Sequence, residues 1–329
     1  MTTAARPVVL CGLGRGRPDG PSAVTVGMFD GVHLGHRRLL DRVVAVAAER
    51  GLRPGAVTFD RHPLEVLAPD KAPRLLTTLR RKLELLGEAG MAWVLVLPFT
   101  PELSRRSAEA FIDQVLRGQA RAAVVVVGPD FRFGHRAAGD VELLRRSSGL
   151  EVDTVELATD QPGGRRLSST WARQAVAAGD VAAAALTLGR PHLVEGRVER
   201  GDGRGRELGV PTANLRLPAR LLVPARGIYA GRLHAPGAAG DGPLPAPAPA
   251  VTSVGVNPTF DGASLKVEAN VLGSDRLELY GRRVTLTFEH RLRSERRYER
   301  VDDLVAQMRL DVAEAGRLLD FQGRRPPAD

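Results

Sequence analysis

Residues 26–36 read Val26-Gly27-Met28-Phe29-Asp30-Gly31-Val32-His33-Leu34-Gly35-His36 and decide the fold of the first half of the chain. An apolar run over 23–28 leads into this stretch, and a helical pattern over 37–49 follows it. A buried strand that turns directly into a helix is typical of an open parallel sheet, in which ligands bind beyond the carboxyl ends of the strands. Glycine at three of these positions lets a ligand approach the backbone closely.

The two histidines of this stretch point to a phosphate site. His33 and His36 are three residues apart, so on the opening turn of a helix they share a face. Unpaired N–H groups and the positive end of the helix dipole favour anions at the same place. A single histidine in a loop would indicate an ordinary polar surface residue. Two imidazoles above a helix start instead suit a triphosphate whose bond at the α-phosphate is breaking.

The rest of the first half alternates strand-like and helix-like segments. Apolar runs without alternation indicate strands that are buried on both faces, and helices between them imply right-handed crossovers. We therefore expect an α/β domain with a Rossmann-like parallel sheet. The predicted strands are 23–28, 56–59, 93–97 and 123–127, and the predicted helices are 37–49, 75–88 and 107–116.

The second half changes character after a helical pattern over 172–188. Short strand-like segments follow one another between turns rich in Gly, Pro and Asp, which predicts a small antiparallel β-barrel that ends in a helix over 301–319. The Pro- and Ala-rich stretch 235–250 lacks periodicity and reads as an extended surface loop. The predicted strands are 192–199, 227–233, 250–256, 264–272 and 283–289.

Composition narrows the classes of protein that fit. The chain has 329 residues, enough for two domains. Its net charge of +9 is spread over both halves, and only three of its 47 basic residues are lysines, so we expect no nucleic-acid partner. The single Cys11 excludes an intrachain disulfide, and no apolar stretch is long enough for a membrane span. These features predict a cytoplasmic protein that does not bind membranes.

A second candidate phosphate site lies in residues 196–214. Glycines such as Gly201 can form a cradle of backbone N–H groups, and Arg204 and Arg206 add positive charge. Thr212 and Asn214 offer neutral oxygens from one face of an extended segment, which suits Mg²⁺ because this ion takes few protein ligands. The glycines alone would equally fit a hairpin with solvated arginines.

With these motifs in order, the chain resembles the bacterial bifunctional riboflavin kinase/FAD synthetase family. The resemblance implies an FMN adenylyltransferase domain over 1–186 and a riboflavin kinase domain over 187–329. It covers nearly the whole chain. The blocks that support it are 26–36, 58–63, 127–134, 168–173, 211–214, 255–260, 267–270, 279–281 and 291–293.

The resemblance also implies roles for single residues. In the first domain it implies ATP phosphates against His33 and His36 as catalytic residues, and the FMN phosphate near Asp130 and Arg132. In the second it implies Mg²⁺ at Thr212 and Asn214, with Glu268 as the general base that takes the riboflavin 5′-hydroxyl proton. Asn257 is implied in flavin binding. The implied nucleotide-binding residues are Gly27, Phe29, Gly31, Ser169, Thr170, Arg173, Gly201 and Arg206.

The expected ligands are therefore riboflavin, FMN and ATP, with Mg²⁺ as cofactor and FMN and FAD as products, in a monomer or weak homo-oligomer. Three places depart from the family pattern: Pro129-Asp130, Trp171-Ala172 and Asn270. They leave open a related enzyme for a modified flavin or another nucleotide. A flavin-binding regulator without catalysis is a further alternative, and without the family context Glu268 could simply pair with an arginine.

Overall fold

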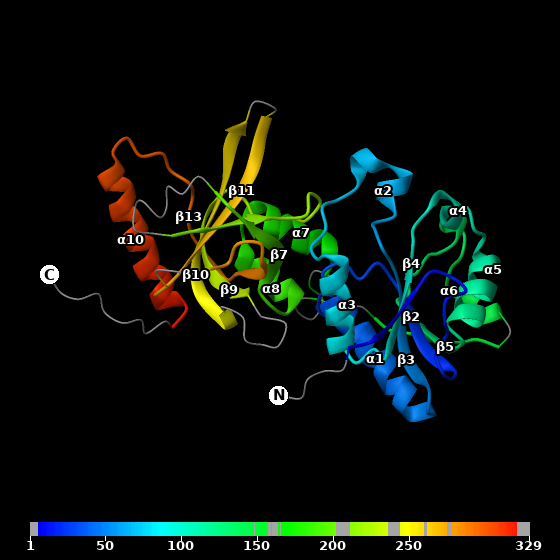
Figure 1. Cartoon of the computed structure of the whole chain (residues 1–329). Coiled ribbons are helices and arrows are strands. Elements are labelled where there is room, and N and C mark those ends of the chain that lie inside the picture. The colour runs from blue at the N-terminus through cyan, green and yellow to red at the C-terminus, as the bar shows by residue number, and fades with distance from the viewer. Residues whose placement is uncertain are drawn as a thin grey trace. The chain divides into compact units, whose positions relative to one another are not determined.

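The computed structural model describes residues 6–147, 149–156, 159, 164, 166–201, 211–235, 244–259, 262–274 and 278–320. The chain packs into two compact units, Met1–Ser169 and Thr170–Asp329 (Figure 1). The functional boundary that the sequence predicts after residue 186 stays a prediction. No helix in the described ranges is both long and apolar enough to cross a membrane.

The N-terminal unit is built on a parallel sheet, as the sequence predicts. Its strands lie in the order β1-β4-β3-β2-β5-β6, and every neighbouring pair is parallel. Two strands were not predicted, and both lie at the edges of the sheet: one is an apolar run of only four residues, and the other is mostly polar. The strands are β1 (Val8–Cys11), β2 (Ser22–Val26), β3 (Arg53–Phe59), β4 (Trp93–Leu97), β5 (Ala122–Val127) and β6 (Glu151–Thr154).

Helices cover both faces of this sheet (Figure 1). Side chains alternate along each strand, so Ala23 of β2 packs with α1 and α3, whereas Val24 packs with α5, η2 and α6 on the other face. The helices with such core contacts are α1 (Leu34–Arg50), α3 (Leu79–Glu88), α5 (Ala108–Phe111), the π-helix η2 (Ile112–Gln119) and α6 (Val141–Arg146). Shorter turns are α2 (Leu64–Leu67), η1 (Pro69–Lys71), α4 (Pro101–Ser104) and η3 (His135–Ala137).

Two predicted helices differ in detail. The pattern over 75–88 becomes α3, which begins only at Leu79 because Thr78 caps it by accepting a hydrogen bond from the Arg81 N–H at 3.1 Å. The pattern over 107–116 becomes α5 followed by η2, whose wider turn closes with the Ala120 N–H donating to the Val115 carbonyl at 2.8 Å.

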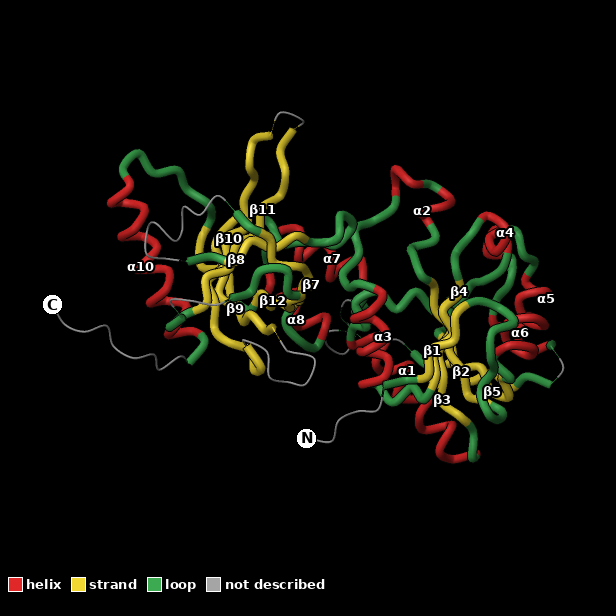
Figure 2. The backbone as a smooth tube through the Cα atoms, in the orientation of Figure 1, coloured by secondary structure: helices red, strands yellow, loops and turns green. Residues whose placement is uncertain are grey.

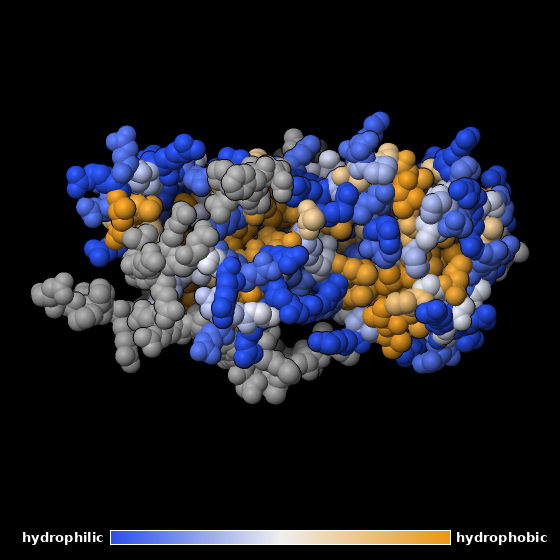
Figure 3. All heavy atoms as spheres, turned by 45° about the horizontal axis from the view of Figure 1, so that its top comes forward, coloured by the Kyte–Doolittle hydropathy of each residue, from blue (hydrophilic) through white to orange (hydrophobic). Residues whose placement is uncertain are grey.

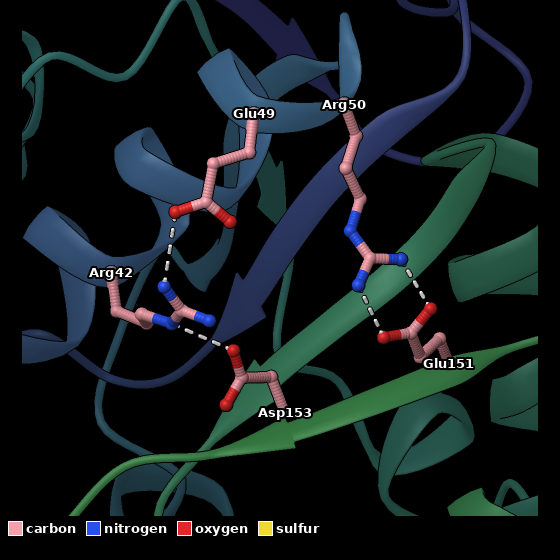
Figure 4. Close-up of polar contacts among 5 residues, drawn as sticks. All are labelled: Arg42, Glu49, Arg50, Glu151 and Asp153. Carbon is pink, nitrogen blue, oxygen red and sulfur yellow. Dashed lines mark hydrogen bonds and ion pairs between the residues drawn. The ribbon is translucent and has the colours of Figure 1, made fainter.

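Ion pairs fasten α1 to β6 (Figure 4). Arg42 donates to Asp153 at 2.7 Å, and Arg50 makes two parallel hydrogen bonds to Glu151, one of them 2.6 Å long. Both arginines are substantially exposed, so each pair contributes little by itself. Together they fix the long axis of the helix whose first turn contains His36.

The C-terminal unit is an antiparallel β-barrel, as predicted. Within the described residues the ring runs β10-β11-β8-β7-β12-β9 and closes through pairing of β9 with β10, while β13 adds to β9. Figure 2 shows β10 and β11 extending together as a hairpin. The strands are β7 (His192–Glu199), β8 (Ala213–Arg216), β9 (Gly227–Ala235), β10 (Leu244–Thr259), β11 (Gly262–Val271), β12 (Arg283–Phe288) and β13 (His290–Arg293).

Two expectations for this half are wrong. The stretch 235–250 is not a loop throughout, because β10 begins at Leu244 and pairs with Ala235; residues 236–243 lie outside the described part. The prolines of this stretch are unfavourable in strands, so its sequence did not predict one. The helix over 172–188 is two helices, α7 (Ser169–Ala178) and α8 (Val181–Leu188), separated by Gly179 with φ 78°. A side chain there would meet the Tyr229 hydroxyl.

Several surface arginines pair with carboxylates. Arg80 and Arg81 contact Glu84, Arg117 contacts Asp113, and further arginines pair in the same way. Figure 3 shows hydrophilic residues over both units, with hydrophobic residues exposed among them, most extensively on the N-terminal unit. The expectation that the chain has no nucleic-acid partner stays a prediction.

A buried ion pair joins the C-terminal helix α10 (Val301–Leu318) to β13. Nε and Nη2 of Arg293 donate to the Asp311 carboxylate at 2.8 and 2.6 Å, and the Asp311 residue is only 5% exposed. Gln307 donates a third hydrogen bond to this carboxylate at 3.0 Å. Hydrogen bonds to Asp311 therefore hold α10 against the barrel together with the apolar contacts of Ala315 and Leu319.

We expect Asp311→Ala to destabilise the C-terminal unit by up to about 3 kcal/mol, because it leaves the partly buried Arg293 guanidinium without its counter-charge. Chemical unfolding of the full chain measures this loss. Asp302→Ala is the matched control, since Asp302 also pairs with an arginine, Arg300, but is exposed. A loss no larger than that of the control would contradict the structural role of the pair.

Candidate functional sites

A buried carboxylate fixes the loop after β2. The Gly27 N–H donates to the Val57 carbonyl at 3.0 Å and so extends the sheet by one bond. Asp30, 2% exposed, then accepts hydrogen bonds from the N–H groups of Leu76 at 3.0 Å and Thr77 at 3.1 Å. Two backbone donors satisfy the desolvated charge, which ties the loop to the segment before α3.

The same loop holds its backbone in an uncommon conformation. Phe29 has φ 49° and Val32 has φ 38°, both in the left-handed region although neither is glycine, and both side chains are buried. Gly31 has φ 80°, and its N–H donates to the Thr77 hydroxyl at 3.1 Å. Such strain persists only where the surroundings fix the backbone, and it is common at functional sites.

The two histidines lie together at the start of α1, as their spacing predicts. His33 caps the helix, its Nδ1 accepting from the His36 N–H at 3.3 Å. The two rings stack with centroids 3.7 Å apart, and the edge of Phe29 meets His36 at 5.2 Å. Because Nδ1 of His33 accepts, a neutral ring has its proton on Nε2, where it suits a phosphate oxygen. The catalytic roles of both residues stay predictions.

A buried lysine that the sequence analysis did not identify joins this loop to the next strand. Lys82 of α3 is 3% exposed, and its ammonium donates to the carbonyls of Met28 at 3.1 Å and Phe59 at 2.7 Å. Loss of hydration lowers its pKa to about 8, against the opposing influence of Asp30 and Asp60. The signal in the sequence was weak: Lys82 is one of three lysines in an arginine-rich chain.

The end of β3 contributes a second carboxylate. Asp60 accepts from the Phe99 N–H at 2.8 Å and from Arg61 at 3.0 Å. Burial raises the pKa of this carboxyl, but the hydrogen bonds and the charge of Arg61 outweigh it and lower the pKa overall. Asp60 is therefore ionised beside Lys82, and the loops after β2, β3 and β4 meet at one edge of the sheet.

The residues predicted for the flavin phosphate are exposed and paired with neighbours. Asp130, after β5, contacts Arg166 at 2.7 Å, and Arg132 contacts Asp140 at 3.2 Å. A phosphate at Arg132 would compete with Asp140 for the same guanidinium. Exposed pairs of this kind are weak, so they leave these side chains able to exchange partners.

Of the predicted nucleotide-binding residues in 168–173, one contacts the loop after β2. The Ser169 hydroxyl donates to the Asp30 carbonyl at 2.9 Å, which brings this predicted residue onto the loop after β2. Thr170 and Arg173 follow in α7 and belong to the second compact unit.

The second site lies on the outer face of the barrel. Asn214 on β8 pairs with Glu268 on β11 and with Glu199 on β7. The neighbours Leu215 and Val267 are buried in the barrel core, so Asn214 and Glu268 face outward side by side. Thr212 precedes β8 by one residue and is half-buried. The structure thus brings the predicted metal ligand Asn214 next to the predicted base Glu268.

Two contacts fix this site. Lys266 Nζ lies 3.2 Å from Glu268 Oε1, so the carboxylate pairs with a lysine two residues away. Asn270 donates from Nδ2 to the Pro211 carbonyl at 2.8 Å, which holds the chain just before Thr212. The departure from the family pattern at Asn270 therefore has a local structural role.

Gly201, the first residue of the glycine-rich segment, lies against Asn214 of this site. A Cβ added to Gly201 would lie 2.2 Å from the Asn214 amide nitrogen, so a larger residue there would displace the Asn214 side chain. Residues 202–210, with Arg204 and Arg206, lie outside the described residues. Asn257 is described only by its backbone, which pairs with Ser264 in the β10–β11 hairpin.

The donor set fits Mg²⁺. The Thr212 hydroxyl, the Asn214 amide oxygen and the Glu268 carboxylate are all oxygen donors, which this ion prefers. Few protein ligands beside a glycine loop leave room for waters and phosphate oxygens. Thr212 and Asn214 would hold the ion, with Glu268 next to it.

Comparison with known proteins connects both sites to named families. Residues 17–171 match the model of the FAD synthetase family, and residues 188–319 match that of the riboflavin kinase family. Among solved structures, one titled as a macrolide-efflux protein from Streptococcus pneumoniae has a TM-score of 0.84 and 29% identity, and the match covers 94% of this chain and 99% of that one.

Curated relatives match along nearly their whole length. The bifunctional riboflavin kinase/FMN adenylyltransferase of Escherichia coli strain K12 is 37% identical over 313 residues, which cover 94% of this chain and 96% of the relative. The protein of the same description from Bacillus subtilis strain 168 is 33% identical over 302 residues, covering 89% and 91%. The chain therefore belongs to the bifunctional riboflavin kinase/FMN adenylyltransferase family.

Proposed function

We propose that this chain is a transferase with two activities, phosphorylating riboflavin to FMN in the barrel and adenylating FMN to FAD at the parallel sheet. The observation that supports it most is that each unit brings together some of the residues predicted for its own reaction. The stacked pair His33 and His36 lies at one sheet edge, and the pair Asn214 and Glu268 lies on the barrel. ATP is the co-substrate in both reactions.

In the N-terminal unit the proposed reaction is adenylyl transfer. A phosphate oxygen of FMN attacks the α-phosphorus of ATP, the bond to the β-phosphate breaks, and pyrophosphate leaves. No covalent intermediate with the protein is needed, so the residues act by position and charge. His33 and His36 would donate to the phosphate oxygens on which charge develops, next to the amino end of α1.

In the barrel the proposed reaction is phosphoryl transfer to the riboflavin 5′-hydroxyl. Glu268 would accept the hydroxyl proton as that oxygen attacks the γ-phosphorus and ADP leaves. Lys266, 3.2 Å from this carboxylate, restricts where it can point. When bound, Mg²⁺ neutralises phosphate charge. Thr212 and Asn214 are the proposed ligands, and Gly201 keeps the backbone close to Asn214.

Removing one imidazole should separate the two activities. His36→Ala should lower FAD formation from FMN by at least ~10²-fold, because a donor to the developing charge is lost. FMN formation from riboflavin should stay within two-fold of the unaltered chain, since the kinase site lies in the other unit. Chromatographic separation of the flavins over time measures both, and equal loss of both activities would overturn the assignment.

Glu268→Gln should have the opposite effect. FMN formation should fall by roughly 10²-fold or more, the usual contribution of a general base, while FAD formation from added FMN continues. Glu314→Gln is a control, because Glu314 is an exposed carboxylate of α10 paired with an arginine. A normal rate of FMN formation in Glu268→Gln would mean that Glu268 only pairs with Lys266.

A further inference from the structure

We propose that Lys82 is a positioning residue of the adenylyl-transfer site, holding the loops after β2 and β3 in the geometry that the reaction requires. The inference rests on the function proposed for the N-terminal unit. Its basis is the position of the ammonium, which donates to the carbonyls of Met28 and Phe59 at 3.1 and 2.7 Å. These carbonyls belong to neighbouring strand ends of one parallel pair.

The loop that Lys82 holds is the one that most needs support. Met28 lies between Gly27 and Phe29, and Phe29 has a left-handed φ of 49°. The ring of Phe29 packs edge-on against His36, 5.2 Å between centroids. A shift of the Met28 carbonyl therefore moves the side chain on which the imidazole rests. A misplacement of about 1 Å is enough to lower a rate by about 10²-fold.

Other side chains also hold this loop: the Thr58 hydroxyl donates to the Met28 carbonyl at 3.2 Å, and the Ser169 hydroxyl donates to the Asp30 carbonyl at 2.9 Å. Further contacts come from the segment before α3. Leu76 and Thr77 bind the Asp30 carboxylate, and the Thr77 hydroxyl accepts from Gly31. These groups precede α3, and Lys82 lies on its first turns. Asp30 fixes the middle of the loop, while Lys82 shares the Met28 carbonyl at its start with the Thr58 hydroxyl. Lys82 also binds the Phe59 carbonyl, so its ammonium joins the two strand ends. Asp30 and Lys82 act on different residues, so the contacts of Asp30 do not replace those of Lys82.

Stability does not explain this lysine. It is 3% exposed, and burial disfavours its charged form, which lowers its pKa from 10.5 to about 8. The charged groups that act on it are Asp30 and Asp60, and Arg61 pairs with Asp60. A group that is destabilised by its surroundings at neutral pH, at the edge of a nucleotide site, is typical of a functional role.

The lowered pKa of Lys82 makes the stability of the folded chain depend on pH. Between pH 8 and 10.5 the unfolded chain binds more protons at this lysine than the folded chain does, so stability from this group rises with pH across that window. Calorimetry should measure the thermal unfolding midpoint of Lys82→Met and of the unaltered chain at pH 7 and at pH 10. Because the variant lacks this pH-dependent gain, its midpoint relative to that of the unaltered chain should be about 5 °C lower at pH 10 than at pH 7. A constant difference between the two proteins would contradict this. Lys71→Met, an exposed lysine of η1, is the control.

The deciding experiment measures kcat and KM for FAD formation from FMN and Mg-ATP in Lys82→Met, with Lys82→Leu as a second variant. We expect kcat to fall at least 10-fold with KM for ATP changed less than three-fold, an unfolding midpoint at pH 7 no lower than that of the unaltered chain, and unchanged FMN formation from riboflavin. The Lys71→Met control should match the unaltered chain in all four measurements.

Two outcomes would overturn the role of Lys82. A kcat within two-fold of the unaltered chain would show that the loops hold their geometry without it. A lower unfolding midpoint at pH 7 together with lost activity, in both variants, would make Lys82 a structural residue. Absence of FAD formation by the unaltered chain would instead contradict the proposed function itself, so the two failures are distinguishable.

Discussion

The buried carboxylate of Asp30 is the constraint on which the N-terminal site depends. The chain leaves β2 at Val26 and must enter α1 at Leu34, with two non-glycine residues in left-handed conformations between them. An ionised group without solvent is stable only when its hydrogen bonds are made, and here they come from the segment before α3. The positions of the loop, the start of α1 and the two imidazoles therefore depend on the hydrogen bonds of one buried carboxylate. The ammonium of Lys82 links the same loop to β3 through the carbonyls of Met28 and Phe59.

Much of the fold follows from apolar patterning. Strands of the N-terminal sheet that are buried on both faces, such as β2 and β4, read as continuous apolar runs. The edge strand β6 is mostly polar and lacks that signal, whereas β1 is apolar but only four residues long. In β10 the prolines suggested a loop, but pairing with β9 keeps this strand extended. Tertiary pairing overrides local propensity there, and no local pattern could have shown it.

The sites were predictable to different extents. The spacing of His33 and His36 was sufficient to place the two rings together, because a helical turn brings such positions onto one face. Lys82 was not predictable, since a lysine in an amphipathic helix ordinarily faces solvent, and its burial depends on carbonyls from distant strands. The proximity of Asn214 and Glu268 required the register of β8 with β11, which sequence alone does not provide.

The proposed function requires one chain to hold two phosphorus-transfer sites that act in series on one flavin. The most direct test incubates the purified full chain with riboflavin and Mg-ATP and separates the flavins over time. The account predicts that FMN appears first and that FAD then accumulates with release of pyrophosphate. Neither product, or FMN that never proceeds to FAD when FMN is also supplied directly, would contradict it.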